Sequence, residues 1–300
     1  RWKWTDDIMH KCPYQGYSSV EVGAILKDKR IIFIGDSMTR ASYHGFNGLV
    51  DGTYDPLVAV EQATIDLKGS GGSTNTVFKH VPLKHSVKST NTDVSFVWAP
   101  TLTDLGEALK QLDDTAYDVL VTGVAVWDAL YTHDVEVYKK QLESLNIPTS
   151  KALTTVWLEP TSIIDMRLNT DTKRQYMTEA QVAPYRAAVK GSININNHVD
   201  VIIDPARSIT PLHGPESITN VHITTGSIDG VHYGAEVYSV IGQVVLNGLQ
   251  LKVKQSGHRV AATPVPVSAS KTIPGTTGTT KKAYKPKPTG SMSFPTSGLI

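Results

Sequence analysis

The distribution of apolar positions along the chain predicts an α/β protein. Short runs rich in β-branched and aromatic residues alternate with longer stretches whose apolar residues recur at helical spacing, as in parallel βαβ units. The expected strands are residues 30–34, 93–98, 117–122, 153–158 and 199–203. The expected helices are residues 38–48, 102–112, 135–145, 179–189 and 233–251. We therefore predict a three-layer αβα sandwich around a parallel sheet of about five strands.

Two segments do not follow this alternation. Residues 50–92 contain a Gly/Ser-rich stretch at 69–73, and we interpret them as an insertion near the mouth of the sheet. Residues 252–300 are rich in Ser, Thr, Pro and Gly and have no periodic apolar pattern, which predicts a disordered stalk. The expected organisation is thus a folded domain of residues 1–251 and a tail of residues 252–300.

Charge separates the same two parts. Residues 1–251 hold 21 basic and 28 acidic residues, a net charge of −7, whereas residues 252–300 carry +8 and no acid. An acidic domain is a poor candidate for nucleic-acid binding, which depends on clustered positive charge. We therefore expect no nucleic-acid partner, and we interpret the basic tail as a linker rather than a nucleic-acid-binding arm.

Length and composition limit the kinds of protein that this chain can be. The 300 residues, 40% of them apolar, suffice for one sizeable core, and no run approaches the roughly 18 apolar residues that a membrane span needs. The single cysteine, Cys12, excludes a disulfide within the chain and a multi-cysteine zinc site; it is either a buried thiol or the partner of a cysteine outside this sequence. The chain begins at Arg1 without a signal-like stretch, so we expect it to be part of a longer protein.

The first candidate for chemistry is Ser37, in the turn Gly35-Asp36-Ser37 after the first expected strand. Ligands of open α/β sheets bind beyond the carboxyl ends of the strands. A serine there also has its amide at a helix N-terminus, where developing negative charge is stabilised. Seen alone, the Gly-Asp-Ser turn is a weak signal, and an ordinary helix-capping serine is the alternative.

The second candidate is the pair Asp229 and His232, directly before the last expected helix. An aspartate three residues before a histidine can accept from one ring nitrogen while the other faces a nucleophile. A serine after the first strand and an Asp-x-x-His before the last helix form the layout of the SGNH, or GDSL, hydrolase superfamily, which this chain resembles.

The resemblance is closer to one family. Residues 4–12, Phe33-Ile34-Gly35-Asp36-Ser37 with Arg40, residues 121–127 and Asp229-Gly230-Val231-His232 resemble the luminal catalytic domain of the CAS family. That family comprises fungal capsule polysaccharide O-acetyltransferases and animal sialic acid O-acetyltransferases. The resemblance covers residues 1–251, least well over 50–92. It implies that the tail leads to a membrane acyltransferase region outside this chain.

The resemblance assigns Ser37 as nucleophile, His232 as general base and then acid, and Asp229 as the group that orients His232. The usual oxyanion-hole asparagine after the third strand is missing, because that strand ends at Gly123 followed by Val-Ala-Val. We expect the Ser37 amide to donate, with Gly123 nearby. Arg40 is either a replacement donor or a structural ion-pair partner of an acid such as Asp36 or Asp128.

Two aromatic residues near the expected strand ends, Trp127 and Tyr233, are candidates for stacking on a sugar, with core packing as the alternative. The pairs His80 with His85 and His213 with His222 have no carboxylate or cysteine at a recognised ligand spacing, so we expect no metal.

These observations predict acyl transfer through an acyl-serine. The resemblance implies an O-acetyltransferase with a glycan or polysaccharide acceptor, acetyl-CoA as ultimate acetyl donor, no bound cofactor, and a place in the Golgi lumen. A carbohydrate O-acetylesterase with the same residues and a non-catalytic glycan-binding module are the alternatives.

Overall fold

The computed structural model describes residues 15–52, 81–150, 153–210, 227 and 229–255. The chain divides into a unit Arg1–Arg259 and a second unit Val260–Ile300, and the description below concerns the first. The motif at residues 4–12, Cys12, the Gly/Ser-rich stretch and nearly all of the expected tail lie outside the described residues. Predictions about them stay predictions.

The centre of the fold is a six-stranded sheet in the order β2-β3-β1-β4-β5-β6. Its strands are β1 (Arg30–Gly35), β2 (Leu83–Val87), β3 (Thr92–Trp98), β4 (Val119–Gly123), β5 (Thr154–Leu158) and β6 (Val201–Ile203). All five predicted strands are present, and β1, β3, β4, β5 and β6 are parallel.

The five predicted strands form the parallel part of the sheet, and β2 adds a sixth, antiparallel strand at its edge. It lies inside the segment interpreted as an insertion, and residues 53–80 of that segment lie outside the described residues. β2 forms a hairpin with β3, whose turn includes Asn91 in the left-handed conformation at φ 52°. Its residues alternate between half-buried and exposed, so its apolar pattern is weaker than that of the central strands.

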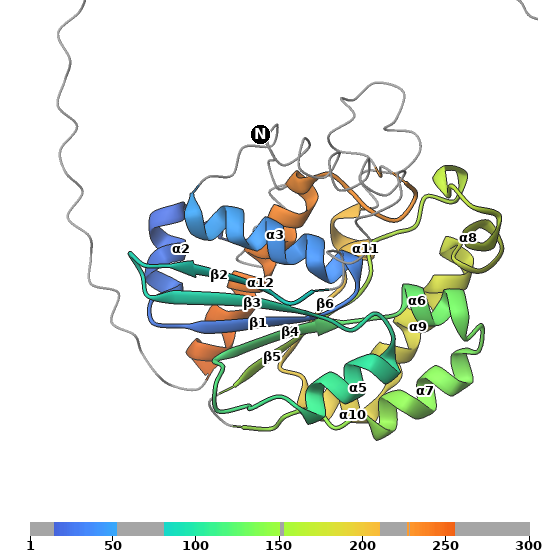
Figure 1. The fold of residues 1–300 in the computed structure, drawn as a ribbon, viewed down its shortest axis with the longest axis horizontal. Helices are drawn as coiled ribbons and strands as arrows, with labels where there is room; N and C mark the ends of the chain where they lie inside the picture. The colour runs from blue at the N-terminus through green and yellow to red at the C-terminus, as the bar shows by residue number, and fades with distance from the viewer. Residues whose placement is uncertain (1–14, 53–80, 151–152, 211–226, 228, 256–300) are drawn as a thin grey trace, which may run out of the picture. The chain divides into compact units, whose positions relative to one another are not determined.

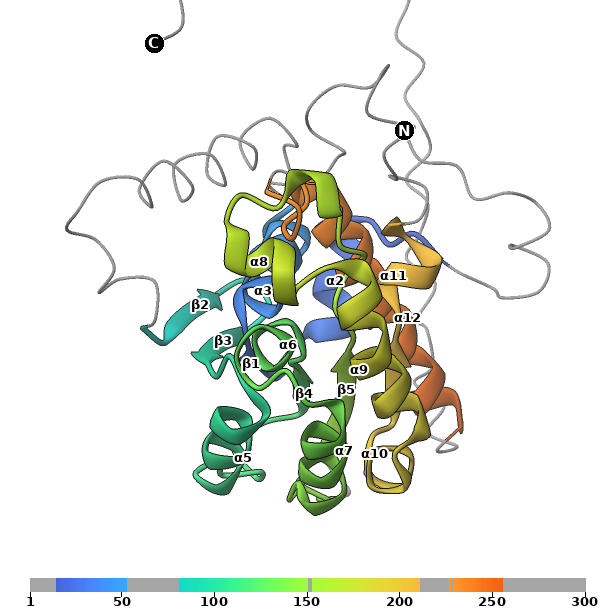
Figure 2. The same ribbon diagram turned by 90° about the vertical axis from the view of Figure 1, so that its right-hand side faces the viewer.

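Helices cover both faces of the sheet, which confirms the three-layer architecture (Figures 1 and 2). One layer holds α2 (Ser19–Leu26), α3 (Ser37–Asp51) and α12 (Ala235–Gln255), and the other holds α5 (Leu102–Lys110), α7 (Val135–Ser144), α9 (Glu179–Gly191) and α10 (Ile193–His198). Strand β1 serves both cores: Ile31 and Phe33 pack towards the first layer, Ile32 and Ile34 towards the second. Helix α12 continues past the predicted domain boundary at residue 251.

Short helices that the sequence pattern did not predict lie around the carboxyl ends of the strands (Figure 1). They are α6 (Val126–Tyr131), η2 (Asp165–Arg167), α8 (Asp171–Tyr176) and α11 (Pro205–Ser208). Each spans fewer than two helical turns, too few for a periodic apolar stripe. Within the described part of the chain, no helix is long and apolar enough to cross a membrane.

Candidate active site

Ser37 is the first residue of α3, directly after β1 ends. Asp36 caps the helix: its Oδ1 accepts the backbone N–H groups of Met38 at 2.9 Å and Thr39 at 3.2 Å. The turn is tight, because a Cβ on Gly35 would lie 2.7 Å from the carbonyl oxygen of Gly123. Strand, glycine and cap together therefore place the Ser37 side chain at the carboxyl edge of the sheet.

The turn that carries Asp229 and His232 is stabilised by hydrogen bonds between the Asp229 side chain and backbone amides of the same turn. Asp229 Oδ1 accepts the N–H groups of Val231 at 3.0 Å and His232 at 2.8 Å, and Gly230 takes a φ of 88°. A side chain at Gly230 would meet the backbone of Leu168 at 2.8 Å in addition to its strained φ. The aspartate therefore both closes the turn and keeps its second oxygen for the histidine ring.

The structure brings the three predicted residues into one hydrogen-bonded chain. His232 Nε2 lies 2.7 Å from Ser37 Oγ, and His232 Nδ1 lies 2.9 Å from Asp229 Oδ2. Ser37 and His232 are separated by 195 residues in sequence. Ser37 is 9% exposed, whereas the His232 side chain is 25% exposed. This geometry allows His232 to take the proton of the Ser37 hydroxyl while Asp229 holds the ring.

The charge of Asp229 is stabilised where it lies. Burial alone would raise the pKa of Asp229, but the hydrogen bond and the charge of His232, with the two backbone amides, hold that pKa well below its usual value. Lys173 of α8, which sequence analysis did not single out, lies with its Nζ 3.8 Å from Asp229 Oδ2. Asp229 is therefore a carboxylate throughout the neutral pH range.

Replacing Lys173 tests this electrostatic arrangement. Lys173→Met removes the positive charge near Asp229, while the hydrogen bond with His232 and the two backbone amides stay, so kcat/KM at neutral pH should remain within about threefold of wild type. Lys139→Met, which removes an exposed partner of Glu136 on α7, should leave kcat/KM unchanged. A loss of about tenfold or more in Lys173→Met would contradict this account.

Thr161, in the loop after β5, is a second residue that sequence analysis missed. Its Oγ1 contacts the carbonyl oxygen of Val231 at 3.3 Å and Met38 Sδ at 3.8 Å. It thus joins the turn of His232 to the first turn of α3. No motif indicates this residue, because the contact forms only when the strand ends meet.

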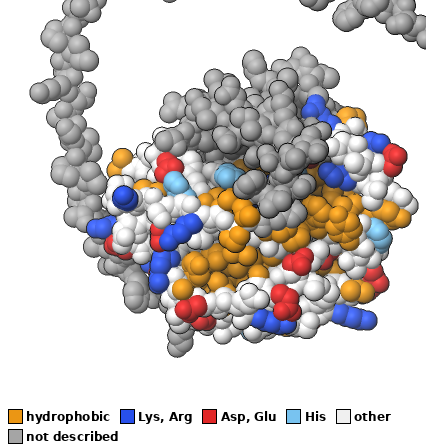
Figure 3. All heavy atoms as spheres, in the orientation of Figure 1, with side chains coloured by type: hydrophobic (Ala, Val, Ile, Leu, Met, Phe, Trp, Pro, Cys, Tyr) orange, Lys and Arg blue, Asp and Glu red, His pale blue; other side chains and the backbone are white. Residues whose placement is uncertain are grey.

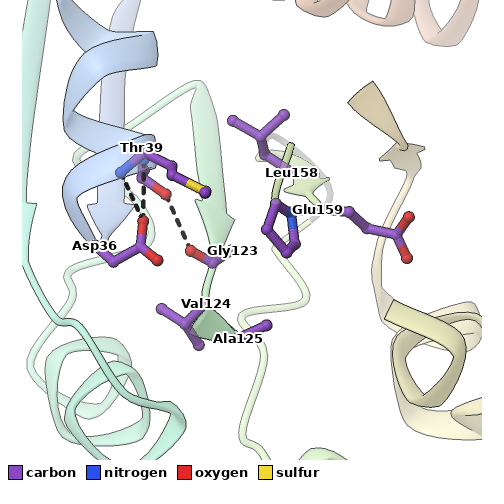
Figure 4. A pocket seen from close by; sticks show the side chains of 9 residues that line it. Asp36, Thr39, Gly123, Val124, Ala125, Leu158 and Glu159 are labelled. Carbon is purple, nitrogen blue, oxygen red and sulfur yellow. Dashed lines mark hydrogen bonds between the residues drawn. The ribbon is translucent and has the colours of Figure 1, made fainter. Parts of the chain in front are cut away.

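Gly123 ends β4 beside the Ser37 turn. With Asp36 and Thr39 it borders a cavity of about 10 Å³, enough for about one water, between the ends of β1, β4 and β5 (Figure 4). Thr39 Oγ1 donates to the Gly123 carbonyl at 3.0 Å, and a Cβ on Gly123 would lie 1.8 Å from the carbonyl oxygen of Leu158. Only glycine fits this backbone approach. Its predicted part in substrate binding stays a prediction.

In the first turn of α3, existing hydrogen bonds exclude some backbone amides as donors to an oxyanion. Two of its amides, those of Met38 and Thr39, are already bound to Asp36. The Ser37 amide therefore remains our candidate on this turn.

Arg40 lies with its guanidinium carbon 5.6 Å from the centre of the Trp98 ring. Burial raises the pKa of Asp36 to about 6, and the charge of Arg40 is one of the smaller effects that oppose this rise. The contact with Trp98 is a cation–π interaction that neither sequence alternative anticipated. A role for Arg40 in the oxyanion hole stays a prediction.

The two candidate sugar-binding aromatics differ in position. Tyr233 is 1% exposed and its hydroxyl donates to the Ser162 carbonyl at 2.9 Å, so its predicted stacking on a sugar is wrong and it is a core residue. Trp127, at the start of α6, is half-buried and contacts Trp98 and Tyr131. Only Trp127 of this pair is placed where a substrate could reach it.

Two buried acids lie beside the site. Asp128 is 2% exposed and accepts the N–H of Leu102 at 3.1 Å; burial, with the nearby charge of Asp36 adding to it, raises the pKa of Asp128 to about 7. Burial likewise raises the pKa of Glu159 to about 7, and its carboxylate points away from the small cavity, as Figure 4 shows. Neither contacts Ser37 or His232 in the hydrogen-bonded chain, so we assign them no step.

Asp128→Asn should change how stability depends on pH. The folded protein holds the Asp128 proton up to a pKa of about 7, whereas the unfolded chain releases it near pH 4, so stability falls as pH rises between these values. The asparagine keeps an acceptor for Leu102 and removes this fall. The unfolding free energy of the variant minus that of wild type should therefore be about 2 to 4 kcal/mol larger at pH 8 than at pH 4. Urea titration at the two pH values measures this difference.

Asp171→Asn is the control, since that side chain is 98% exposed, and should change stability equally at both pH values. An unchanged pH dependence in Asp128→Asn would show that Asp128 is ionised in the folded state.

Of the four histidines in the two candidate metal-binding pairs, only His85 lies within the described residues. Its Nε2 lies 2.9 Å from Asp51 Oδ1. Among the described residues, no three His, Cys, Asp or Glu side chains are grouped as a metal site requires.

Fold and site together place a serine, a histidine and an aspartate at the carboxyl edge of an α/β sheet with helices on both faces. No family model matches the chain. Protein ALTERED XYLOGLUCAN 9 from Arabidopsis thaliana is 23% identical over 278 residues, which cover 85% of this chain and 70% of that protein. The resemblance to the CAS family stays an expectation.

Among solved structures, a lipase/acylhydrolase from Enterococcus faecalis is similar, with 16% sequence identity and a TM-score of 0.42. The match covers 76% of this chain and 96% of the lipase/acylhydrolase chain. A catalytic mutant of an acetylxylan esterase from Geobacillus stearothermophilus matches 74% of this chain and 94% of its own, with 12% identity and a TM-score of 0.39.

Proposed function

We propose that this protein is an O-acetyltransferase that moves an acetyl group through an acyl-Ser37 intermediate onto a hydroxyl of a glycan or polysaccharide. The observation that carries the proposal is the chain of contacts from Asp229 through His232 to Ser37, at 2.9 and 2.7 Å. The glycan acceptor is supported by the relative, whose name refers to xyloglucan, a polysaccharide.

The proposed reaction has two halves. His232 accepts the hydroxyl proton as Ser37 Oγ attacks the acetyl carbonyl, and the oxyanion is stabilised by the Ser37 amide. The donor then leaves with the proton from His232. In the second half His232 takes the proton of a sugar hydroxyl as the sugar oxygen attacks the acyl-serine. The bond between the acetyl carbon and Ser37 Oγ then breaks, His232 returns the proton to Ser37 Oγ, and the acetylated sugar leaves.

A carbohydrate O-acetylesterase is the second candidate. The His232 side chain is 25% exposed, so water can reach the ring that activates the acceptor. The two functions share Ser37, His232 and Asp229 and differ only in which hydroxyl collects the acetyl group.

Further proposals rest on the family resemblance alone. They are that acetyl-CoA is the ultimate donor, that a membrane acyltransferase region outside this chain delivers the acetyl group, and that the domain works in the Golgi lumen.

Mass spectrometry of the protein incubated with an activated acetyl ester tests the proposal. We expect a gain of about 42 Da that maps to Ser37 and is absent from Ser37→Ala. Adding a glycan acceptor should discharge the adduct faster than water does and yield acetylated sugar. Discharge to free acetate at a rate indifferent to every glycan would favour the esterase, and no adduct on Ser37 would overturn both functions.

A further inference from the structure

Helix α6 buries one side against the core and leaves aromatic side chains partly or largely in solvent on the other. Tyr131 is 63% exposed and Trp127 is half-buried, whereas Asp128 between them is 2% exposed. Trp127 and Tyr131 are four residues apart, so both lie on one side of the helix, and their ring centres are 5.4 Å apart. Trp127 also packs against the core, but core packing does not account for the exposed ring of Tyr131.

The aromatic surface continues towards the nucleophile. Trp127 makes an edge-to-face contact with Trp98 at 6.1 Å, and the Arg40 guanidinium lies over Trp98. Trp98 ends β3 and α6 follows β4, and these two strands flank β1, whose end leads to Ser37. The row Trp98–Trp127–Tyr131 therefore runs outward from beside the Ser37 turn. Figure 3 shows hydrophobic side chains gathering on the face that carries α5 and α6.

We propose that the aromatic row formed by Trp98, Trp127 and Tyr131 is a subsite that binds a pyranose ring of the acceptor chain, with Tyr131 as its outer platform. The proposal rests on the proposed function and adds the acceptor's binding surface. Aromatic ring faces carry partial negative charge and attract the C–H groups on a sugar face, while the sugar hydroxyls stay in water. A half-exposed row of rings suits that ligand.

Tyr131 is the last residue of α6, and the rings of Trp127 and Trp98 come before it in the row that starts beside the Ser37 turn. We expect a sugar on Tyr131 to be a neighbour, in the same polysaccharide, of the sugar whose hydroxyl reaches Ser37. The subsite therefore favours oligosaccharides over monosaccharides.

Calorimetry of glycan binding tests this subsite without relying on turnover. The probes are xyloglucan oligosaccharides, mannotetraose and the corresponding monosaccharides. Tyr131→Ala should raise the Kd of at least one oligosaccharide about tenfold and leave monosaccharide binding within twofold. Tyr131→Phe keeps the ring and should bind as wild type does.

The control is Ile193→Ala, which truncates a 70% exposed apolar side chain on α10 and should bind every probe normally. Equal oligosaccharide binding by Tyr131→Ala and wild type, or no binding of any oligosaccharide by wild type, would overturn the subsite. Acetyl-ester turnover by wild type is measured separately. Its absence would overturn the proposed function, whereas turnover with unchanged Tyr131→Ala binding would overturn only the subsite.

Discussion

Ser37→Ala should lower the turnover of small acetyl esters by at least about 10⁴-fold. The hydroxyl at this position is the atom that His232 Nε2 meets at 2.7 Å, whereas the other hydroxyl of this turn, Thr39 Oγ1, donates to the Gly123 carbonyl at 3.0 Å. Because water can take its place at the partly exposed ring, the free energy of unfolding should change by no more than about 1 kcal/mol. Stopped-flow or absorbance assays with an aryl acetate, together with thermal unfolding, measure both effects.

The chain offers a matched control on the same helix. Ser42 of α3 is 2% exposed and donates to the Met38 carbonyl at 3.0 Å, away from the hydrogen-bonded chain of Ser37. Ser42→Ala removes the same atoms from a more buried site and should keep turnover within about threefold. If Ser37→Ala retained wild-type turnover, the enzyme reading would fail, and a glycan-binding module without catalysis would take its place.

The central strands could be predicted because burial on both faces leaves a strong mark in the sequence. Residues 31–34 of β1 are buried throughout, so they form a continuous apolar run that polar loops then interrupt. Edge strand β2 has one face in solvent, and its alternating residues resemble a polar loop. The antiparallel strand β2 was therefore not visible in the pattern.

The pair of sequence motifs identified the hydrogen-bonded chain because each motif is local. Asp229 and His232 are three residues apart, and the Ser37 turn follows directly from β1. Lys173 on α8, Thr161 in the loop after β5 and Trp98 at the end of β3 come from separate elements that meet only when the parallel strands end at one edge. Their roles depend on three-dimensional neighbours, which one sequence does not reveal.

Tyr233 shows that a residue next to the site in sequence need not face the site. It is adjacent to His232 in sequence, so proximity to the site suggested contact with substrate. Successive residues in this turn point in opposite directions, and Tyr233 enters the core against α12 while His232 faces Ser37. Nearness along the chain therefore predicted position but not direction.

Asp229→Asn should lower turnover by about 10⁴-fold while the fold is kept. The asparagine oxygen can still accept from the amides of Val231 and His232, which preserves the turn. Its NH₂ group then faces His232 Nδ1, and two donors cannot share that contact, so the ring must present Nδ1 as acceptor and Nε2 as donor. A ring that already carries its proton on Nε2 cannot take the proton of Ser37.

The double variant His232→Ala with Asp229→Asn provides the sharper measurement. If Asp229 acts only by orienting His232, removing both should cost about as much as removing His232 alone, because residues that act as one unit do not contribute additively. The loss in Asp229→Asn should also persist from about pH 5 to pH 9, since asparagine does not titrate. A loss below about tenfold, or additive losses in the double variant, would show that His232 is oriented by another group, such as a backbone carbonyl, and that the Asp229 carboxylate serves the turn alone.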